Sequence, residues 1–147
     1  MDRSLHLYIV CDGMGGHLSG EVASATAVNM TRDLIQARRE IIDTYLHSPE
    51  DNTTEAIHNL LKESVESASA RIHERGIMNP EQRGMGTTLT ALLLVGQRGF
   101  IAQVGDSRVY RIREDEIEQL TEDHSLYNAM LQSGAQLDNE AALGRLK

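Results

Sequence analysis

The hydrophobic pattern of this chain changes its period near residue 86. Before that point, apolar residues recur every three to four positions over two long segments, which is typical of amphipathic helices. After it, short apolar runs are separated by connections of three or four mostly polar residues, which is typical of antiparallel hairpins. We therefore expect an α+β fold with helices grouped on a largely antiparallel sheet.

Three elements are predicted before the change in period. The first is almost continuously apolar and is expected to be a strand buried on both faces. The third opens with Asn52 and Glu55, a spacing that resembles a capping box. The predicted elements are a strand over Leu5–Cys11, a helix over Ser19–His47 with Ser19 as N-cap and a break at Pro49, and a helix over Asn52–Arg75 with Gly76 as its stop.

Four strands and a short helix are predicted after the change. The connections Gln97–Gly99 and Arg113–Glu116 are short, so neighbouring strands are expected to pair as hairpins. With 147 residues and no repeat or linker, the chain is expected to form a single domain over 1–147. The predicted elements are strands over Thr87–Val95, Phe100–Val104, Ser107–Ile112 and Ile117–Leu120, and a helix over Ser125–Ser133 that stops at Gly134.

Composition argues against two classes of binding partner and favours one cellular location. The formal net charge of −8 argues against nucleic acid and anionic membranes, which need clustered Lys and Arg. The lone Cys11 excludes an intrachain disulfide framework and favours a reducing, cytoplasmic location. No apolar stretch of membrane-spanning length and no secretory leader is visible in the sequence.

A carboxylate follows the first predicted strand. Asp12 is succeeded by Gly13, Gly15 and Gly16, which allow a sharp turn and leave backbone carbonyls uncovered, and by His17. Carboxylate and carbonyl oxygens are the ligands that Mg²⁺ and Mn²⁺ prefer. An ordinary Asp-Gly turn explains the same run about as well when it is taken alone.

A second carboxylate, Asp106, lies in the abrupt connection between two predicted strands. A hairpin turn in which Asp106 bonds its own backbone is the simpler interpretation of this position alone. Further on, Asp123 has the chemistry of a helix cap. His124 is a candidate metal ligand, proton carrier or hydrogen-bonded structural residue.

Together these segments resemble the bacterial PPM-type (protein phosphatase 2C-like) family of metal-dependent Ser/Thr protein phosphatases. The resemblance implies an α-β-β-α sandwich, in which antiparallel sheets are flanked by helices, and it covers nearly the whole chain. Four motifs carry it, in the order of the family: Asp12-Gly13-Met14-Gly15-Gly16-His17, Gly86-Thr87-Thr88, Gly105-Asp106-Ser107-Arg108 and Glu122-Asp123-His124-Ser125.

The resemblance also implies residue roles. Asp12 would bridge two tightly bound Mn²⁺ or Mg²⁺ ions, Gly13 would offer its carbonyl to one of them, and Asp106 would serve a third, weaker ion. His17 matches a histidine considered a proton donor in bacterial members, whereas many eukaryotic members carry the histidine at the position of Met14. The second and fourth motifs would be mainly structural, and the segment from about Met130 to Leu146 would begin a flap beside the site.

The implied activity is hydrolysis of phosphoserine and phosphothreonine in proteins by a metal-activated water, with a Ser/Thr kinase and its substrates as partners. The family's first strands, with a phosphate-binding Arg, have no counterpart before Met1, and its last metal-binding aspartates have none up to Lys147. We therefore expect an internal fragment or a truncated gene product that is inactive alone. Two alternatives remain: a non-catalytic relative that binds phosphoproteins or another partner, and a plain structural or metal-binding α+β domain.

Overall fold

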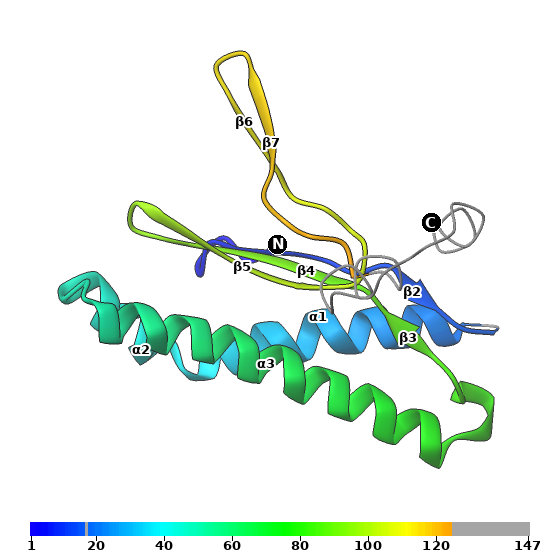
Figure 1. The fold of residues 1–147 in the computed structure, drawn as a ribbon. Coiled ribbons are helices and arrows are strands. Elements are labelled where there is room, and N and C mark those ends of the chain that lie inside the picture. Colours follow the sequence, from blue (N-terminus) through cyan, green and yellow to red (C-terminus); the bar gives the residue numbers. More distant parts are fainter. Residues whose placement is uncertain (17, 125–147) are drawn as a thin grey trace, which may run out of the picture. The chain divides into compact units, whose positions relative to one another are not determined.

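The computed structural model describes residues 1–16 and 18–124 (Figure 1). These residues belong to two compact units, divided between Gln103 and Val104. Helices and antiparallel strands are both present, so the predicted α+β class is confirmed. That the chain is one domain stays a prediction. In chain order the elements are β1 (Leu7–Val10), β2 (Gly13–Met14), α1 (Ser19–Ala37), α2 (Arg39–His47), α3 (Asp51–Met78), a 3-10 turn (Pro80–Gln82), β3 (Gly86–Thr87), β4 (Leu89–Val95), β5 (Arg98–Val104), β6 (Tyr110–Arg113) and β7 (Glu116–Gln119).

The first unit contains a three-stranded sheet in the order β1-β4-β5. Strands β1 and β4 are antiparallel, with Leu7 opposite Leu93 and Val10 opposite Thr90. Only two residues join β4 to β5, and the first of them, Gly96, has a φ of +58°, which suits a tight hairpin turn.

The helices cover one face of this sheet (Figure 1). Alternate residues of the strands point toward them, which leaves Leu7 and Leu93 no more than 1% exposed. From the helical side, Ile35 of α1 and Ile57 of α3 are completely buried. Each such side chain contributes roughly 1.5–3 kcal/mol of transfer free energy, so this interface is the main support of the first unit.

The predicted helix over Ser19–His47 is wrong in one respect, because the structure divides it at Arg38 into α1 and α2. Arg38 has φ −115° and ψ 31°, outside the helical region, although no proline or glycine is present there. The break accompanies the burial of Ile42 and Tyr45 by α2, and the Tyr45 ring meets Phe100 edge-on with 5.8 Å between centroids. The break therefore coincides with tertiary packing against β5, which a local helix pattern does not report.

The predicted helix starts are displaced by one or two residues. The cap of α1 is Leu18, and Ser19 is instead buried, with its hydroxyl donating to the Glu81 carbonyl at 3.0 Å. The cap of α3 is Glu50, whose N–H donates to Thr53 Oγ1 at 2.8 Å. Thr53 therefore supplies the reciprocal bond that the sequence assigned to Glu55.

Gly76 does not stop α3, which continues to Met78. It is buried inside the helix, and a Cβ at this position would lie 3.3 Å from the carbonyl oxygen of Gln82. The glycine thus allows the chain to fold back closely against α3, which is a packing role rather than a terminating one.

The predicted strands are confirmed with shifted bounds, but the expectation that the first is buried on both faces is wrong: Tyr8 and Val10 of β1 are exposed, because the helices cover only one face of this strand. The predicted strand over Thr87–Val95 is divided at Thr88 into β3 and β4, and β3 pairs with β2 instead of joining the main sheet. In the second unit β6 and β7 form the expected antiparallel hairpin, with Ile112 opposite Ile117. The predicted helix over Ser125–Ser133 lies outside the described residues.

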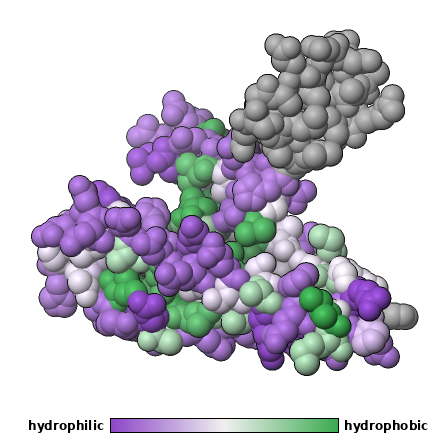
Figure 2. Space-filling model, turned by 60° about the horizontal axis from the view of Figure 1, so that its bottom comes forward, coloured by the Kyte–Doolittle hydropathy of each residue, from purple (hydrophilic) through white to green (hydrophobic). Residues whose placement is uncertain are grey.

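The helical face of the first unit is predominantly hydrophilic and is interrupted by separate apolar patches (Figure 2). None of the described helices is both long enough and apolar enough to cross a bilayer.

Candidate metal centre

Asp12 follows β1 and is exposed, but its backbone is held on both sides. Its N–H donates to Thr88 Oγ1 at 3.0 Å, and its carbonyl oxygen accepts the N–H of Thr88 at 2.9 Å. Thr88 lies between β3 and β4, so both strands fix its position. The aspartate is therefore presented by a rigid strand end, as the sequence predicts.

Gly13 is in direct backbone contact with the first turn of α1. A Cβ on Gly13 would lie 1.9 Å from the carbonyl oxygen of Gly20, closer than any real contact. A Cβ on Gly20 would lie 3.0 Å from the carbonyl carbon and oxygen of Gly13. Both positions therefore require glycine for space, and the start of α1 packs directly on the Asp12–Gly13 element.

The glycine-rich loop, residues 13–16, also contacts α1. The N–H of Ser19 donates to the Gly16 carbonyl at 3.1 Å. Gly15 has a φ of +149°, and a Cβ there would lie 2.9 Å from the Cβ of Ser19. Since the Ser19 hydroxyl is bonded to Glu81, the loop, the first turn of α1 and the segment after α3 support one another.

The oxygen donors in the first unit are of the chemical types that bind a hard divalent cation. Asp12 supplies a carboxylate, and Gly13 supplies a backbone carbonyl. Across residues 1–16 and 18–124, however, no three His, Cys, Asp or Glu side chains lie together in a way that could hold a metal ion. Such an ion takes roughly six oxygen ligands, so the described residues provide part of a coordination shell.

The neighbouring Cys11 is not suited to metal binding. Burial raises the pKa of its thiol, opposed by a hydrogen bond with Thr87 that acts in the other direction. Thiolates suit soft metals, whereas Mg²⁺ and Mn²⁺ prefer oxygen ligands, so this half-buried thiol is not counted among the donors. His17, the predicted proton donor, lies outside the described residues, and its role stays a prediction.

Asp106 belongs to the second unit, where it is exposed in the connection after Val104. The preceding Gly105 is held by His124 in two ways: its N–H donates to His124 Nδ1 at 3.2 Å, and its carbonyl accepts the His124 N–H at 2.9 Å. His124 therefore has a structural role here, one of the three options that the sequence leaves open. The metal role of Asp106 stays a prediction.

Asp123 forms a bidentate ion pair with Arg108, with N–O distances of 2.8 and 2.7 Å. Hydrogen bonding to the Arg108 guanidinium lowers the pKa of the Asp123 carboxyl, and the pKa of Arg108 rises in turn, mainly through its bond to Asp123. The pair joins the two ends of the β6–β7 hairpin, so the structural role implied for this motif agrees with the contacts. The helix that Asp123 was expected to cap lies outside the described residues.

The sequence reasoning missed two supporting residues. Gly20 has an available signal, since a glycine in the first turn of a helix costs stability and usually allows a close contact. Thr88 belongs to the motif Gly86-Thr87-Thr88, but its bonds to Asp12 join residues 76 positions apart and leave no local pattern.

Comparisons with known proteins identify the family of this chain. A family model described as Protein phosphatase 2C matches residues 2–144. The Serine/threonine phosphatase stp of Listeria innocua serovar 6a is 36% identical over 128 residues, which are 87% of this chain and 47% of that protein. Protein phosphatase PhpP of Streptococcus pneumoniae serotype 2 is 37% identical over 135 residues, which are 92% and 50% of the two chains.

Solved structures extend the similarity to the fold. The catalytic domain of the serine threonine protein phosphatase PstP, crystallised in complex with 2 manganese ions, superposes with a TM-score of 0.66 at 32% identity, covering 92% of this chain and 53% of that one. The chain belongs to the protein phosphatase 2C family of bacterial PPM-type phosphatases. It spans about half the length of the relatives that it matches.

Proposed function

We propose that this chain is part of a metal-dependent protein phosphatase that hydrolyses phosphoserine and phosphothreonine in proteins. The observation that carries the proposal is the Asp12–Gly13 element, whose backbone is held by Thr88 and packed against Gly20. Family membership supports the reaction class, and the manganese ions of the PstP structure support Mn²⁺ or Mg²⁺ as the cofactor.

When bound, a pair of divalent ions supplies an activated water and neutralises charge on the phosphoryl oxygens. Asp12 would hold these ions through its carboxylate, and the hydrogen bonds to Thr88 would keep that carboxylate in place. Gly13 would add its carbonyl oxygen. His17 would protonate the departing serine or threonine oxygen, and Asp106 would serve a third, weaker ion.

The donor set of the described residues suggests the behaviour of the chain on its own. Because no three ligating side chains lie together among them, we propose weak binding of divalent ions and no appreciable phosphatase activity for the isolated 147 residues. We further propose a cytoplasmic location and a Ser/Thr kinase that phosphorylates the same substrates.

The test is Mn²⁺-dependent release of phosphate from a phosphothreonine peptide by the complete product of the gene. Asp12→Asn should abolish most of this activity, since it removes the charge of the proposed bridging ligand. Asp115→Asn, an exposed aspartate in the β6–β7 turn, is the matched control and should leave the rate unchanged. Normal activity of Asp12→Asn would contradict the metal role. A complete product that binds phosphopeptides without hydrolysing them would favour the non-catalytic alternative.

A further inference from the structure

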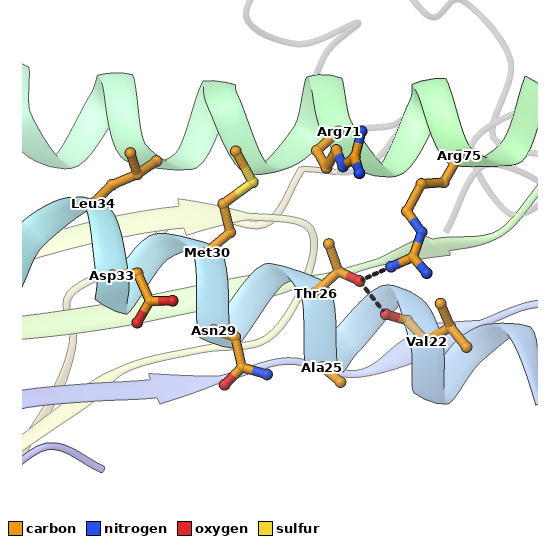
Figure 3. A pocket seen from close by; sticks show the side chains of 9 residues that line it. All are labelled: Val22, Ala25, Thr26, Asn29, Met30, Asp33, Leu34, Arg71 and Arg75. Carbon is orange, nitrogen blue, oxygen red and sulfur yellow. Dashed lines mark hydrogen bonds between the residues drawn. The ribbon is translucent and has the colours of Figure 1, made fainter.

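A groove of about 640 Å³ lies between α1 and α3, on residues that take no part in the Asp12 element (Figure 3). Val22, Met30 and Leu34 of α1 are half-buried and give it an apolar lining. Arg71 and Arg75 extend from α3 over the same groove. It therefore combines an apolar lining with two guanidinium groups.

Arg75 is held in position by a neutral partner. Its Nη1 donates to Thr26 Oγ1 at 3.0 Å, and the hydroxyl of Thr26 donates in turn to the Val22 carbonyl at 2.7 Å (Figure 3). No ion pair formed within the described part of the chain includes Arg75. Its orientation is thus fixed while its charge is not compensated by a bonded carboxylate, and most of its five N–H donors remain available.

Arg71 precedes Arg75 by one helical turn, so both side chains extend from the same face of α3. Arg71 pairs with Glu74 at 2.8 Å, but the two side chains are 52% and 55% exposed. An exposed pair of this kind is worth little and opens at small cost. Glu74 therefore does not hold Arg71 tightly, and a dianion bound near Arg75 would compete with Glu74 for Arg71.

The charges of the groove are unevenly distributed. The arginines lie at one end, whereas the acidic residue Asp33 lies toward the other and is bonded to its neighbour Arg32 at 2.9 Å (Figure 3). Met30 and Leu34 lie beside Asp33 on the same helix. On a chain with a net charge of −8, this arginine pair is a local site for a negative group, adjacent to apolar surface.

We propose that this groove docks a phosphorylated peptide segment, with its phosphate between Arg71 and Arg75 and an aliphatic side chain against Met30 and Leu34. Phosphate fits better than a single carboxylate, because its double charge and three terminal oxygens match two guanidinium groups. The inference rests on the proposed function, since the segment would be a second phosphorylated region of a substrate protein, held away from the Asp12 element.

The test measures binding in the presence of a chelator, so that no metal site contributes. The probe is a fluorescent phosphothreonine peptide with flanking leucines, titrated with the 147-residue chain and followed by anisotropy. Arg71→Gln and Arg75→Gln should each weaken binding by roughly tenfold, the loss expected for one charge-assisted contact. Arg98→Gln, an exposed arginine at the start of β5, is the matched control and should bind normally.

Two further measurements make the result specific. The unphosphorylated peptide should bind at least tenfold more weakly, and inorganic phosphate should compete. Thr26→Val keeps the side-chain shape but removes the acceptor that orients Arg75, so it should weaken binding severalfold with little change in thermal unfolding. Equal affinity of Arg71→Gln and the unchanged chain would overturn the proposal, and so would equal affinity for the unphosphorylated peptide. If the Arg75→Gln variant does not fold, the binding affinity of Arg71→Gln, a change at an exposed residue, tests the proposal.

Activity measurements distinguish failure of the docking proposal from failure of the proposed function. In the complete gene product with Mn²⁺, Arg71→Gln should raise KM for a doubly phosphorylated peptide and leave hydrolysis of p-nitrophenyl phosphate unchanged. Absence of p-nitrophenyl phosphate hydrolysis in the unchanged protein would contradict the phosphatase activity, whereas chelator-resistant peptide binding would still support the groove. An unaltered KM for the doubly phosphorylated peptide would contradict the docking role.

Discussion

Asp12 and Thr88 hold each other through two hydrogen bonds, from the Asp12 N–H to the Thr88 hydroxyl oxygen at 3.0 Å and from the Thr88 N–H to the Asp12 carbonyl at 2.9 Å. These bonds connect the strand end that carries the carboxylate to the junction of β3 and β4. Both bonds use backbone atoms of Asp12, so the Asp12 carboxylate takes part in neither of them. This arrangement is expected for a group that must face a ligand.

Thr88→Val should loosen Asp12 while keeping the shape of the side chain. The Asp12 N–H loses its acceptor, so we expect a cost of about 1 kcal/mol, faster hydrogen exchange at the Asp12 amide and weaker Mn²⁺ binding. Exchange measured by NMR and titration calorimetry check this. Thr90→Val is the control, because the Thr90 hydroxyl has no hydrogen-bond partner in the part of the chain that the structure describes and its removal should leave Asp12 unaffected. Unchanged exchange at Asp12 in Thr88→Val would contradict the supporting role.

Gly20→Ala should disturb the Asp12–Gly13 element from the side of the helix. The new methyl group would lie 3.0 Å from the carbonyl carbon and oxygen of Gly13, so one of the two backbones must shift. We expect a loss of about 1–3 kcal/mol in the free energy of unfolding, as for other overpacked sites, together with weaker Mn²⁺ binding. Denaturant unfolding and calorimetry measure the two effects. A methyl group at Gly16 would meet no atom within 4 Å among residues 1–16 and 18–124, so Gly16→Ala should be tolerated. Equal behaviour of the two variants would refute the packing argument.

Thr31→Val should stabilise the first unit. Thr31 is fully buried in α1, and its hydroxyl oxygen has no hydrogen-bond partner among the described residues. Valine has nearly the same shape and removes the cost of burying an unsatisfied hydroxyl, so the free energy of unfolding should rise by about 1 kcal/mol. Thermal or urea unfolding tests this. A lower midpoint would show that the hydroxyl has a partner in solution.

The β6–β7 hairpin should lose order in acid through Asp123. Its ion pair with Arg108 lowers the pKa of the carboxyl in the folded state. The stabilisation is therefore present above the unfolded pKa, about 3.9, and is lost as the pH falls through the lower folded value. Protection of the Leu120 amide, which donates to the Val109 carbonyl at 2.8 Å, should decrease over that window.

Asp123→Asn should show the reduced protection of the Leu120 amide already at neutral pH, with no further loss in acid from this source. Asp115→Asn keeps the ion pair and serves as the control. Acid-induced loss of protection that persists fully in Asp123→Asn would assign the effect to another carboxyl group.

Some features of the fold are predictable because their signals are local. The strand leading to Asp12, the helical segments and the β6–β7 hairpin follow from hydrophobic period and turn residues, which depend on neighbours a few positions away. The break at Arg38 is not of this kind: no local signal marks it, and it accompanies a long-range contact, that of Tyr45 with Phe100.

The sequence by itself determined the α+β class and the family, and it predicted Asp12 as a ligand in the candidate metal centre. Only the tertiary structure showed that Thr88 and Gly20 support that residue and that Thr26 orients Arg75 beside a groove. The physical reason is the range of the interactions. Periodicity and turn chemistry act over a few residues, whereas these contacts exist only after β1, β4 and the two long helices have packed together.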